Sequence, residues 1–474
     1  MTAVHPERPW ANGVEAVRIL APLGMLGYGY PLAHFEAGLA RDPHLIAVDA
    51  GSTDGGPHKL GKGVGIVSEA ATRRDLEPML RAAVERGIPV VVGTAGGSGS
   101  RLHVEWARRI VAGILSDHGW AARVAVIDAD VPPDRVVAAL AEGDLRPLRA
   151  VPEADEATIR ACPAIVAQMG VEPIVAALEQ GADIVLCGRS YDPTMFAALP
   201  IMLGFPAGLA FHMGKILECG AQCAIPGAAS DCMIGTLDHE GFVLEPLGPE
   251  RRCTPTSVAA HTLYEKSDPA RLPGPGGDLV LDQCRFEAVS DRAVRVTGSR
   301  FEPSDEYRVK LEGSAPEGYR AICIAGLRDP QMIARLDECL DAVRKATQEF
   351  GGFAGEAGFG LNFLCYGRDA VLGESEPLRD AVPHEVGVVI DAVGPTQTDA
   401  DALCSLARSS LLHYHYTGRK ATGGNLAFPF APSDFQGGPV FRFALYHTMK
   451  VRDGLELFPI RWIGEEGKVG RAAE

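Results

Sequence analysis

The chain has 474 residues, of which 46% are hydrophobic and 22% charged, a composition typical of a globular protein rather than a disordered or coiled-coil chain. Its net charge of −16 argues against general binding to nucleic acid or to an anionic membrane. No apolar run approaches the roughly 20 residues of a membrane helix, and no signal peptide is visible, so we expect a cytoplasmic protein. The eleven cysteines are scattered and odd in number, which predicts free thiols rather than a disulfide scaffold.

The first half of the chain alternates apolar runs of strand length with helical patterns. Strands are predicted at residues 17–20, 45–48, 88–92, 123–127 and 183–186, and helices at 70–86, 101–118 and 134–141. Continuous apolar strands that alternate with helices are typical of a parallel sheet buried on both faces. We therefore predict an α/β fold with an N-terminal parallel sheet covered by helices on both faces.

The pattern changes after about Gly220 and predicts an α+β second half. Strands are predicted at residues 242–244, 279–286, 293–296, 307–311, 385–390 and 440–451, and helices at 329–350 and 399–413. We divide the chain into an α/β domain at 1–222 that carries the ligand loops, an α+β domain at 223–393 and a C-terminal α+β subdomain at 394–474.

Glycine-rich polar loops follow three of the predicted strands, at residues 49–56, 93–100 and 188–193. Ligands bind beyond the carboxyl ends of strands in a parallel sheet, so we expect these loops to open on one cavity. Their backbone N–H groups and hydroxyls would suit a carboxylate or phosphate, and the alternative is a set of tight turns that cap the next helix. The anion-binding candidates in the first two loops are Ser52, Thr53, Thr94, Gly96, Gly97 and Ser98.

Asp49 and Asp54 are the candidate metal ligands. The two carboxylates flank two hydroxyl residues, and hard oxygen ligands of this kind suit Mg²⁺ or the recognition of a substrate hydroxyl. The alternative is an Asx-turn in which each aspartate caps its own loop.

Arg189 is the candidate clamp for a substrate carboxylate or phosphate, because its planar guanidinium can donate two parallel hydrogen bonds. Asp192, in the same loop, is a second substrate-binding candidate. An aspartate that precedes Pro193 is also typical of a helix N-cap, which is the structural alternative for Asp192.

The segment at 212–220 carries the candidate catalytic residues, which share one face if it is a helix. His212 would be the general base, and Lys215 would stabilise an enolate or a carboxylate. Glu218 would orient these groups or act as an acid, and Cys219 would be a nucleophile. We expect the Lys215 ammonium to keep His212 neutral near pH 7. The structural alternative is an exposed Glu–Lys pair beside a buried histidine and cysteine.

Arg419 and Lys420 are substrate-binding candidates near the C-terminus. They precede a pair of glycines in a polar segment that starts at His413, so they could close on an anion. The same segment contains an H-x-H pair, His413 and His415. On a strand that spacing would suit a metal, but at a helix end the two rings point apart.

Several of these motifs together resemble the acyclic terpene utilisation A-like family. The motifs are Asp49-Ala-Gly-Ser-Thr-Asp-Gly-Gly, Gly93-Thr-Ala-Gly-Gly-Ser-Gly, Leu186-Cys-Gly-Arg-Ser-Tyr-Asp-Pro, Gly214-Lys-Ile-Leu-Glu-Cys-Gly-Ala, Cys253-Thr-Pro, Leu263-Tyr-Glu, Asp268-Pro and Arg295-Val-Thr-Gly. The similarity runs through most of residues 15–450, and the combination is specific while each motif alone is weak. The resemblance implies a catabolic protein with a small companion subunit, for which the tail at 438–447 is a candidate fused equivalent.

We predict a catabolic lyase, either a hydratase or dehydratase or a carbon–carbon lyase. Its substrate would be a branched or unsaturated carboxylic acid or its CoA thioester, and its chemistry would be proton abstraction with stabilisation of an enolate. Two alternatives stay open, namely a hydrolase or acyl transferase that uses Cys219 or a loop serine, and a non-catalytic acyl-binding subunit. We expect a homo-oligomer without nucleic-acid or membrane partners, and the cofactor candidates are Mg²⁺ and CoA as part of the substrate.

Overall fold

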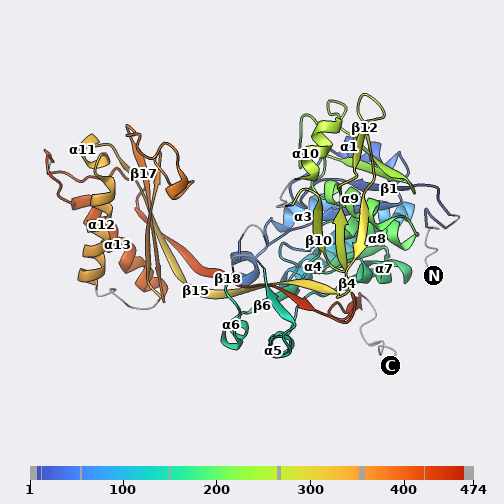
Figure 1. Cartoon of the computed structure of the whole chain (residues 1–474), viewed down its shortest axis with the longest axis horizontal. Helices are drawn as coiled ribbons and strands as arrows, with labels where there is room; N and C mark the ends of the chain where they lie inside the picture. Colours follow the sequence, from blue (N-terminus) through green and yellow to red (C-terminus); the bar gives the residue numbers. More distant parts are fainter. Residues whose placement is uncertain are drawn as a thin grey trace. The chain divides into compact units, whose positions relative to one another are not determined.

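The computed structural model describes residues 8–11, 13–53, 56–148, 151–263, 268–351, 358–420 and 422–463 (Figure 1). Two compact units are formed, the first by Met1–Ser314 with Phe443–Glu474 and the second by Ala315–Arg442. Strands β15 (Arg308–Leu327) and β18 (Asp434–Lys450) each contribute residues to both units. These boundaries differ from the predicted ones after residues 222 and 393, because the strands after residue 222 extend the N-terminal sheet.

A ten-stranded sheet forms the centre of the first unit. In spatial order its strands are β12 (Arg285–Ala288), β13 (Val294–Thr297), β9 (Gly241–Pro246), β8 (Met233–Leu237), β1 (Val17–Ala21), β2 (Leu45–Asp49), β3 (Val90–Gly93), β7 (Ile184–Cys187), β4 (Val124–Ile127) and β19 (Ile460–Trp462). The five strands from β1 to β4 in this order are parallel, and β8, β9, β13 and β12 continue the sheet in antiparallel pairs. The predicted N-terminal parallel sheet is therefore confirmed.

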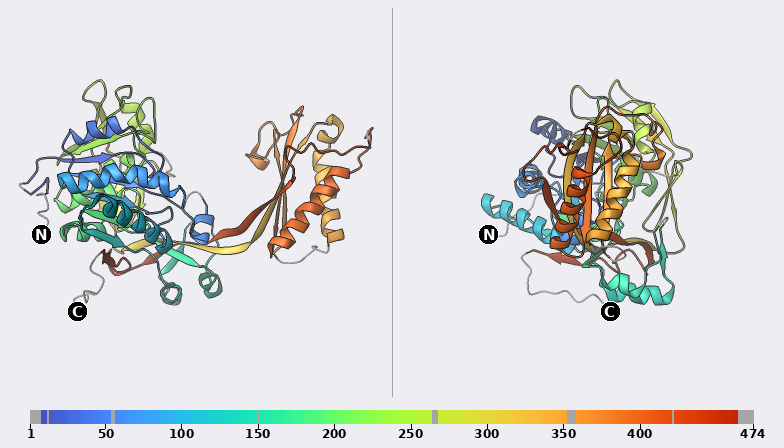
Figure 2. Two further views of the ribbon diagram at one scale, coloured as in Figure 1. Left: turned by 180° about the vertical axis from the view of Figure 1, so that it is seen from behind. Right: turned by 90° about the vertical axis from the view of Figure 1, so that its left-hand side faces the viewer.

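Helices cover both faces of the parallel strands, as the unbroken apolar runs predict. The helices of the first unit are α1 (Leu32–Leu39), α2 (His58–Lys62), α3 (Glu69–Arg86), α4 (Arg101–His118), α5 (Pro133–Glu142), α6 (Glu156–Arg160), α7 (Glu172–Glu179), α8 (Thr194–Met202), α9 (Ala207–Leu217) and α10 (Pro255–Thr262). α1, α3 and α4 share one hydrophobic core with alternate strand residues such as Val48, Val92 and Leu186. α7, α8 and α9 contact the sheet from the other side (Figures 1 and 2).

The sheet has a topological switch point between β3 and β7. The chain leaves β3 into α4, which packs on one face, and it leaves the adjacent strand β7 into α8, which packs on the other. The two connections therefore diverge at the carboxyl ends of neighbouring strands, and α/β sheets commonly bind ligands at such switch points. The loops at 94–100 and 188–193 lie at this switch point.

Local signals explain why helices α3 and α4 begin and end where the sequence predicts. The Ser68 hydroxyl accepts a hydrogen bond from the N–H of Ala71 at the start of α3. Gly87 and Gly119 follow the two helices in the left-handed conformation that commonly ends a helix. Among the described residues, none of the helices has the length and apolar character needed to cross a membrane.

The predicted strand at 279–286 is wrong as a single element. β11 (Gly277–Val280) pairs with β10 (Arg271–Gly274) and β14 (Arg300–Pro303) in a small three-stranded sheet, whereas β12 belongs to the large sheet. A turn in which the N–H of Cys284 donates to the carbonyl of Leu281 carries the chain from one sheet to the other. Asp282 and Gln283 form this turn, so the polar pair between the two apolar stretches is the local signal of the break.

The second unit has the order β15, α12 (Leu336–Gly351), β16 (Gly360–Tyr366), β17 (Val386–Gly394), α13 (Gln397–His413) and β18. The sheet order is β16-β17-β15-β18, which is the split β-α-β arrangement of ferredoxin-like folds. A short helix, α11 (Pro330–Ile333), precedes α12, so the predicted helix at 329–350 is two helices. β5 (Leu145–Pro147) and β6 (Ala164–Ala167) pair with the parts of β18 and β15 in the first unit.

The loops after β2 and β3 approach each other too closely for a side chain between them. A Cβ atom on Gly51 would overlap the carbonyl oxygen of Gly97. A Cβ atom on Gly99 would overlap the backbone nitrogen of Arg189 in the loop after β7, and Gly99 also has a φ of +66°. The three predicted loops therefore lie in contact at one edge of the sheet.

Gly51→Ala should lower the free energy of unfolding by about 2–3 kcal/mol, because the added methyl group meets backbone that cannot rotate away. The matched control is Gly113→Ala in α4, where the nearest atom to an added Cβ is the Arg73 Nη1 at 3.5 Å. This control should gain up to about 1 kcal/mol from helix propensity. Denaturant unfolding of both variants measures the difference, and equal stabilities would contradict the close packing of the loops.

Candidate functional site

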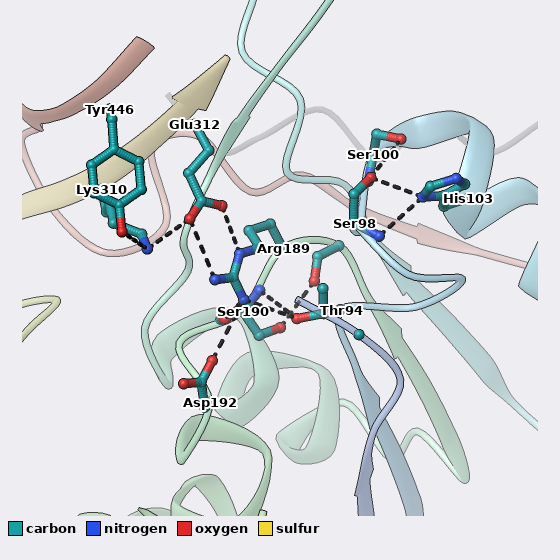
Figure 3. A network of polar contacts seen from close by, with 12 residues as sticks. Thr94, Ser98, Ser100, His103, Arg189, Ser190, Asp192, Lys310, Glu312 and Tyr446 are labelled. Atoms are coloured by element: carbon teal, nitrogen blue, oxygen red, sulfur yellow. Dashed lines mark hydrogen bonds and ion pairs between the residues drawn. The ribbon is translucent and has the colours of Figure 1, made fainter. Parts of the chain in front are cut away.

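The loops after β3 and β7 are joined through Thr94. Its hydroxyl accepts hydrogen bonds from the backbone N–H of Ser190 at 3.2 Å and from Nη1 of Arg189 at 3.4 Å (Figure 3). Thr94 is buried and has a φ of +44°, which is uncommon for a residue with a branched Cβ. Strained backbone of this kind concentrates at functional sites, where the surrounding structure holds it in place.

Arg189 is fully engaged by protein groups. Its Nε donates to Glu312 Oε2 at 2.8 Å, its Nη2 faces Oε1 of the same carboxylate at 3.4 Å, and its Nη1 donates to the carbonyl of Ser190 at 2.9 Å. Nη1 also lies 3.5 Å from Asp192. A substrate carboxylate would have to share or displace these partners, so the role of Arg189 as a clamp stays a prediction.

Glu312 is a buried residue of the site that the sequence analysis missed. Its carboxylate lies between Arg189 and the Nζ of Lys310, which is 2.6 Å from Oε1 (Figure 3). Burial would raise the pKa of Glu312, but Arg189 and Lys310 outweigh it and lower the pKa to about 2. Lys310 also lies over the ring of Tyr446. Lys310 and Glu312 alternate with Val309 and Leu311, a pattern typical of exposed charged side chains, so no local signal marks Glu312 as buried.

Lys215 and Glu218 form a buried ion pair at the C-terminal end of α9. Burial raises the pKa of Glu218 well above its ordinary value, Asp192 raises it further, and Lys215 opposes both. Burial would lower the pKa of Lys215, but Glu218 and Asp192 raise it, so the ammonium stays charged. The structural alternative of an exposed Glu–Lys pair is therefore wrong in its exposure. His212 and Lys215 lie on α9 as the spacing predicts, whereas the helix ends at Leu217, before Glu218 and Cys219.

Asp49 belongs to the same electrostatic cluster. It is the last residue of β2, and burial raises its pKa well above the ordinary value of 3.8. The neighbouring charge of Asp192 adds to this effect, whereas Arg189 opposes it. The loop after β2 also carries Ser52, which is partly buried, and Thr53, which is buried. Asp49 therefore faces the groups that follow β7 and α9.

His212 is buried, and each of its ring nitrogens has a hydroxyl as hydrogen-bond partner. Its Nδ1 is 2.7 Å from the Ser299 hydroxyl, and its Nε2 is 3.0 Å from the Thr262 hydroxyl. Phe242 and Phe286 contact the ring edge-on. Burial lowers the pKa of His212 to about 3, so the expected neutral form is correct but its expected cause, the Lys215 ammonium, is not. Its role as a base stays a prediction.

His261 is the histidine whose pKa is affected by the charge of Lys215. It lies in the last turn of α10, one residue before the Thr262 that bonds His212, and it is buried. Burial lowers its pKa to about 4, and the Lys215 ammonium contributes to this shift. The sequence analysis missed His261, although it lies between two of the motifs that carry the family resemblance, Cys253-Thr-Pro and Leu263-Tyr-Glu.

Ser98 pairs with His103 at the start of α4. The Ser98 hydroxyl is 2.8 Å from Nδ1 of His103, and the Ser98 N–H donates to the same nitrogen at 3.0 Å (Figure 3). Nδ1 is therefore an acceptor, and both side chains are buried. Gly96 and Gly97 complete this loop, which the pair holds against the helix.

Arg419 and Lys420 belong to the second unit, whereas Cys219 follows Glu218 at the end of α9, and its charge contributes to the raised pKa of Lys215. The guanidinium of Arg419 donates to the carbonyls of His413, Tyr414 and Gly423. Lys420 beside it is exposed, and both stay predictions as ligand groups. Cys219 is partly exposed after α9.

The predicted Mg²⁺ site is not assembled by the described residues. Asp54, the second predicted metal ligand, lies outside the described residues. Within the described ranges, no group of three or more His, Cys, Asp or Glu side chains is arranged to hold a metal ion. The metal assignment stays a prediction.

Comparison with known proteins identifies a family. The model of the acyclic terpene utilisation family protein AtuA matches residues 68–427, which include the loops after β3 and β7, the end of α9 and most of the second unit. No curated protein and no solved structure matches the chain. The match confirms the family predicted from the sequence motifs, and it begins after the Asp49 loop.

Asp49→Asn should stabilise the fold at high pH. Because the pKa of Asp49 is higher in the folded than in the unfolded chain, the carboxyl contributes stability at low pH that is lost as the pH rises above about 3.8. The free energy of unfolding of the variant should therefore exceed that of the parent increasingly between pH 5 and pH 9. The full gain is about 1.4 kcal/mol for each unit by which folding raises the pKa of Asp49. Denaturant unfolding across this range tests it, with the exposed Asp305→Asn as the control, and a pH-independent difference would contradict the assignment.

His212→Ala should destabilise the protein by about 3 kcal/mol, since it leaves a cavity and removes the partner of two buried hydroxyls. His212→Phe keeps most of the volume and should lose about 1–2 kcal/mol, because the Ser299 and Thr262 hydroxyls each lose one hydrogen bond while Thr262 keeps its bond to the carbonyl of Val258. Thermal unfolding of both variants provides the measurement. An unchanged melting temperature with lost activity would instead support His212 as the base.

Proposed function

Because the chain belongs to the acyclic terpene utilisation family AtuA, we propose that it is a catabolic lyase for a branched or unsaturated carboxylic acid or its CoA thioester. The family is named for the use of acyclic terpenes, and their isoprene skeletons give acids that are both branched and unsaturated. Adding or removing water, or cleaving a carbon–carbon bond next to a carbonyl, is the chemistry that such acids require for degradation.

The observation that carries the proposal is the buried charge cluster at the switch point. Asp49 and Glu218 both have raised pKa values, and each is affected by the charge of Asp192. Two carboxyl groups that oppose each other's ionisation divide the roles of acid and base between them. The cluster therefore supports proton transfer between a protein carboxyl group and a substrate, which a lyase needs.

The cluster also favours an enolate intermediate. With Asp49 protonated and Glu218 ionised, the cations Arg189, Lys215 and Lys310 balance the carboxylates Asp192, Glu218 and Glu312. Transfer of the substrate proton to Glu218 then leaves one positive charge in excess. An excess positive charge in a buried site stabilises an enolate more strongly than the same charge in water. Of these cations, Lys215 forms the ion pair with Glu218, the carboxylate to which we assign the transfer of the substrate proton.

The reaction proceeds by proton transfer in a dehydration or its reverse. The bond between the α-carbon and its hydrogen breaks, the proton passes to a carboxylate of the cluster, and the electron pair forms an enolate beside Lys215. The bond from the β-carbon to oxygen then breaks while the hydroxyl takes a proton from the other carboxyl group and leaves as water. We assign Glu218 to the first proton transfer and Asp49 to the second.

A second candidate function is acyl transfer through Ser98, and the Ser98–His103 pair favours it. A serine whose hydroxyl lies within hydrogen-bonding distance of a neutral histidine has the geometry of an activated nucleophile. Burial of both side chains favours the simpler interpretation that the pair closes the loop. An increase in the intact mass by one acyl group, lost in Ser98→Ala, would support this candidate over the lyase.

The lyase is tested by proton exchange in D2O with a 3-methyl-branched 2-enoyl-CoA and its free acid. We expect the chain to catalyse loss of the proton signal next to the carbonyl in the hydrated substrate, measured by NMR. Glu218→Gln should slow this exchange about 10²–10⁴-fold, because the glutamine cannot accept the proton. The matched control is Glu349→Gln in the exposed pair Lys345–Glu349, which should leave the rate unchanged.

Two outcomes would contradict this function. An unchanged exchange rate in a folded Glu218→Gln variant would show that Glu218 does not accept the substrate proton. Saturable binding of the thioester without exchange or turnover would favour the non-catalytic acyl-binding subunit instead.

A further inference from the structure

In the part of the second unit that the structure describes, helices α12 and α13 cover one face of the sheet. Ala321, Cys323 and Ala325 of β15 pack with α12 and α13 in one hydrophobic core. Side chains alternate along a strand, so the residues between them point to the opposite face. In the described part of this unit the helices lie on one side of the sheet (Figure 1). We call the opposite side the open face.

Strand register brings an apolar band together on the open face. Ile324 of β15 lies opposite Val389 of β17, and Val389 lies opposite Leu364 of β16, so one row crosses three strands with aliphatic side chains. The next row ends in Tyr366. The exposed fractions are 39% for Ile324, 38% for Leu364 and 52% for Tyr366. Apolar side chains that gather in this way mark an interaction surface, whereas scattered ones do not.

The open face also carries one pair of opposite charges. Nε of Arg320 lies 2.7 Å from Oδ1 of Asp391, and register places both residues on the same side as Ile324. A surface with one positive and one negative group side by side can pair with a second copy of itself that is rotated by 180°. Each positive group then meets the negative group of the other copy. A nucleic acid or an anionic membrane would instead require an excess of positive charge, which a chain of net charge −16 does not favour.

We propose that two copies of the chain associate through their open faces about a two-fold axis. The aliphatic rows pack on each other, and each Arg320 faces the partner's Asp391, as an isologous interface requires. Four strands of about nine residues offer a face of roughly 20 by 30 Å. This area is of the order of the ~800 Å² that each partner buries in a standard interface. The proposal does not depend on the lyase function.

The oligomeric state tests the proposal directly. Sedimentation equilibrium of the full chain between about 0.1 and 100 µM should show a monomer–dimer equilibrium or a stable dimer. Ile324→Glu places a charge in the apolar row and should raise the dimer dissociation constant at least about 30-fold. The matched control is Val289→Glu, at a side chain 52% exposed in the first unit, which should not change it. Both variants should keep the parent melting temperature within a few degrees.

A charge-swap mixture tests the two-fold pairing. Arg320→Glu and Asp391→Arg each place like charges opposite each other in a homodimer, so each variant alone should be mainly monomeric. Mixing them should restore dimers that contain one chain of each kind, while the ion pair within each chain stays broken. A monomeric parent at 100 µM, a dimer unaffected by Ile324→Glu, or a mixture that stays monomeric would overturn the proposal.

Discussion

The buried ion pair between Arg189 and Glu312 is the interaction on which the candidate site depends. It joins the loop after β7 to a strand 123 residues further along the chain. Removing two charges from water is costly, and only good geometry with additional hydrogen bonds compensates for it. Here Lys310 gives Glu312 a second cation, while Ser190 and Thr94 accept from Arg189. Loss of one partner would leave the other charge buried and unpaired, at a cost of about 3–5 kcal/mol.

This ion pair determines what the rest of the site can do. Because Glu312 occupies the guanidinium, Arg189 organises the loops rather than presenting a free fork to solvent. The groups with raised pKa values, Asp49 and Glu218, lie within reach of the same charges. Proton chemistry is therefore assigned to these carboxyl groups, and the adjoining loops are held rigidly by backbone contacts that exclude even a methyl group.

Strand β15 links the two parts of the molecule in one element. It carries Lys310 and Glu312 in the first unit and the aliphatic row that contains Ile324 in the second. A β-strand alternates its side chains between two faces, so one sequence can hold a buried charge in one sheet environment and an exposed apolar band in another. The predicted strand at 307–311 covers only the beginning of this element, because charged and small residues after Leu311 interrupt the apolar pattern.

The two histidines show where reasoning from helical spacing reaches its limit. The spacing places His212 and Lys215 on one helix, and this is correct. Spacing within a helix does not reveal what packs against it, however. Helix α10 brings the Thr262 hydroxyl to His212, and it also brings His261 close to Lys215. The neighbour that matters chemically comes from a segment about 45 residues away, so no local pattern contains it.

Sequence alone predicts the family, the five parallel strands, the helices α3, α4 and α5, and the three glycine-rich loops. These properties depend on local signals, namely apolar runs, helix caps and glycines, which act over a few residues. The tertiary structure alone decided the partner of Arg189, the burial of Lys215 and Glu218, and which face of the second sheet is left open. Each of these depends on which distant strands and helices meet, and on the removal of charges from water when they do, so it appears only once the chain is folded.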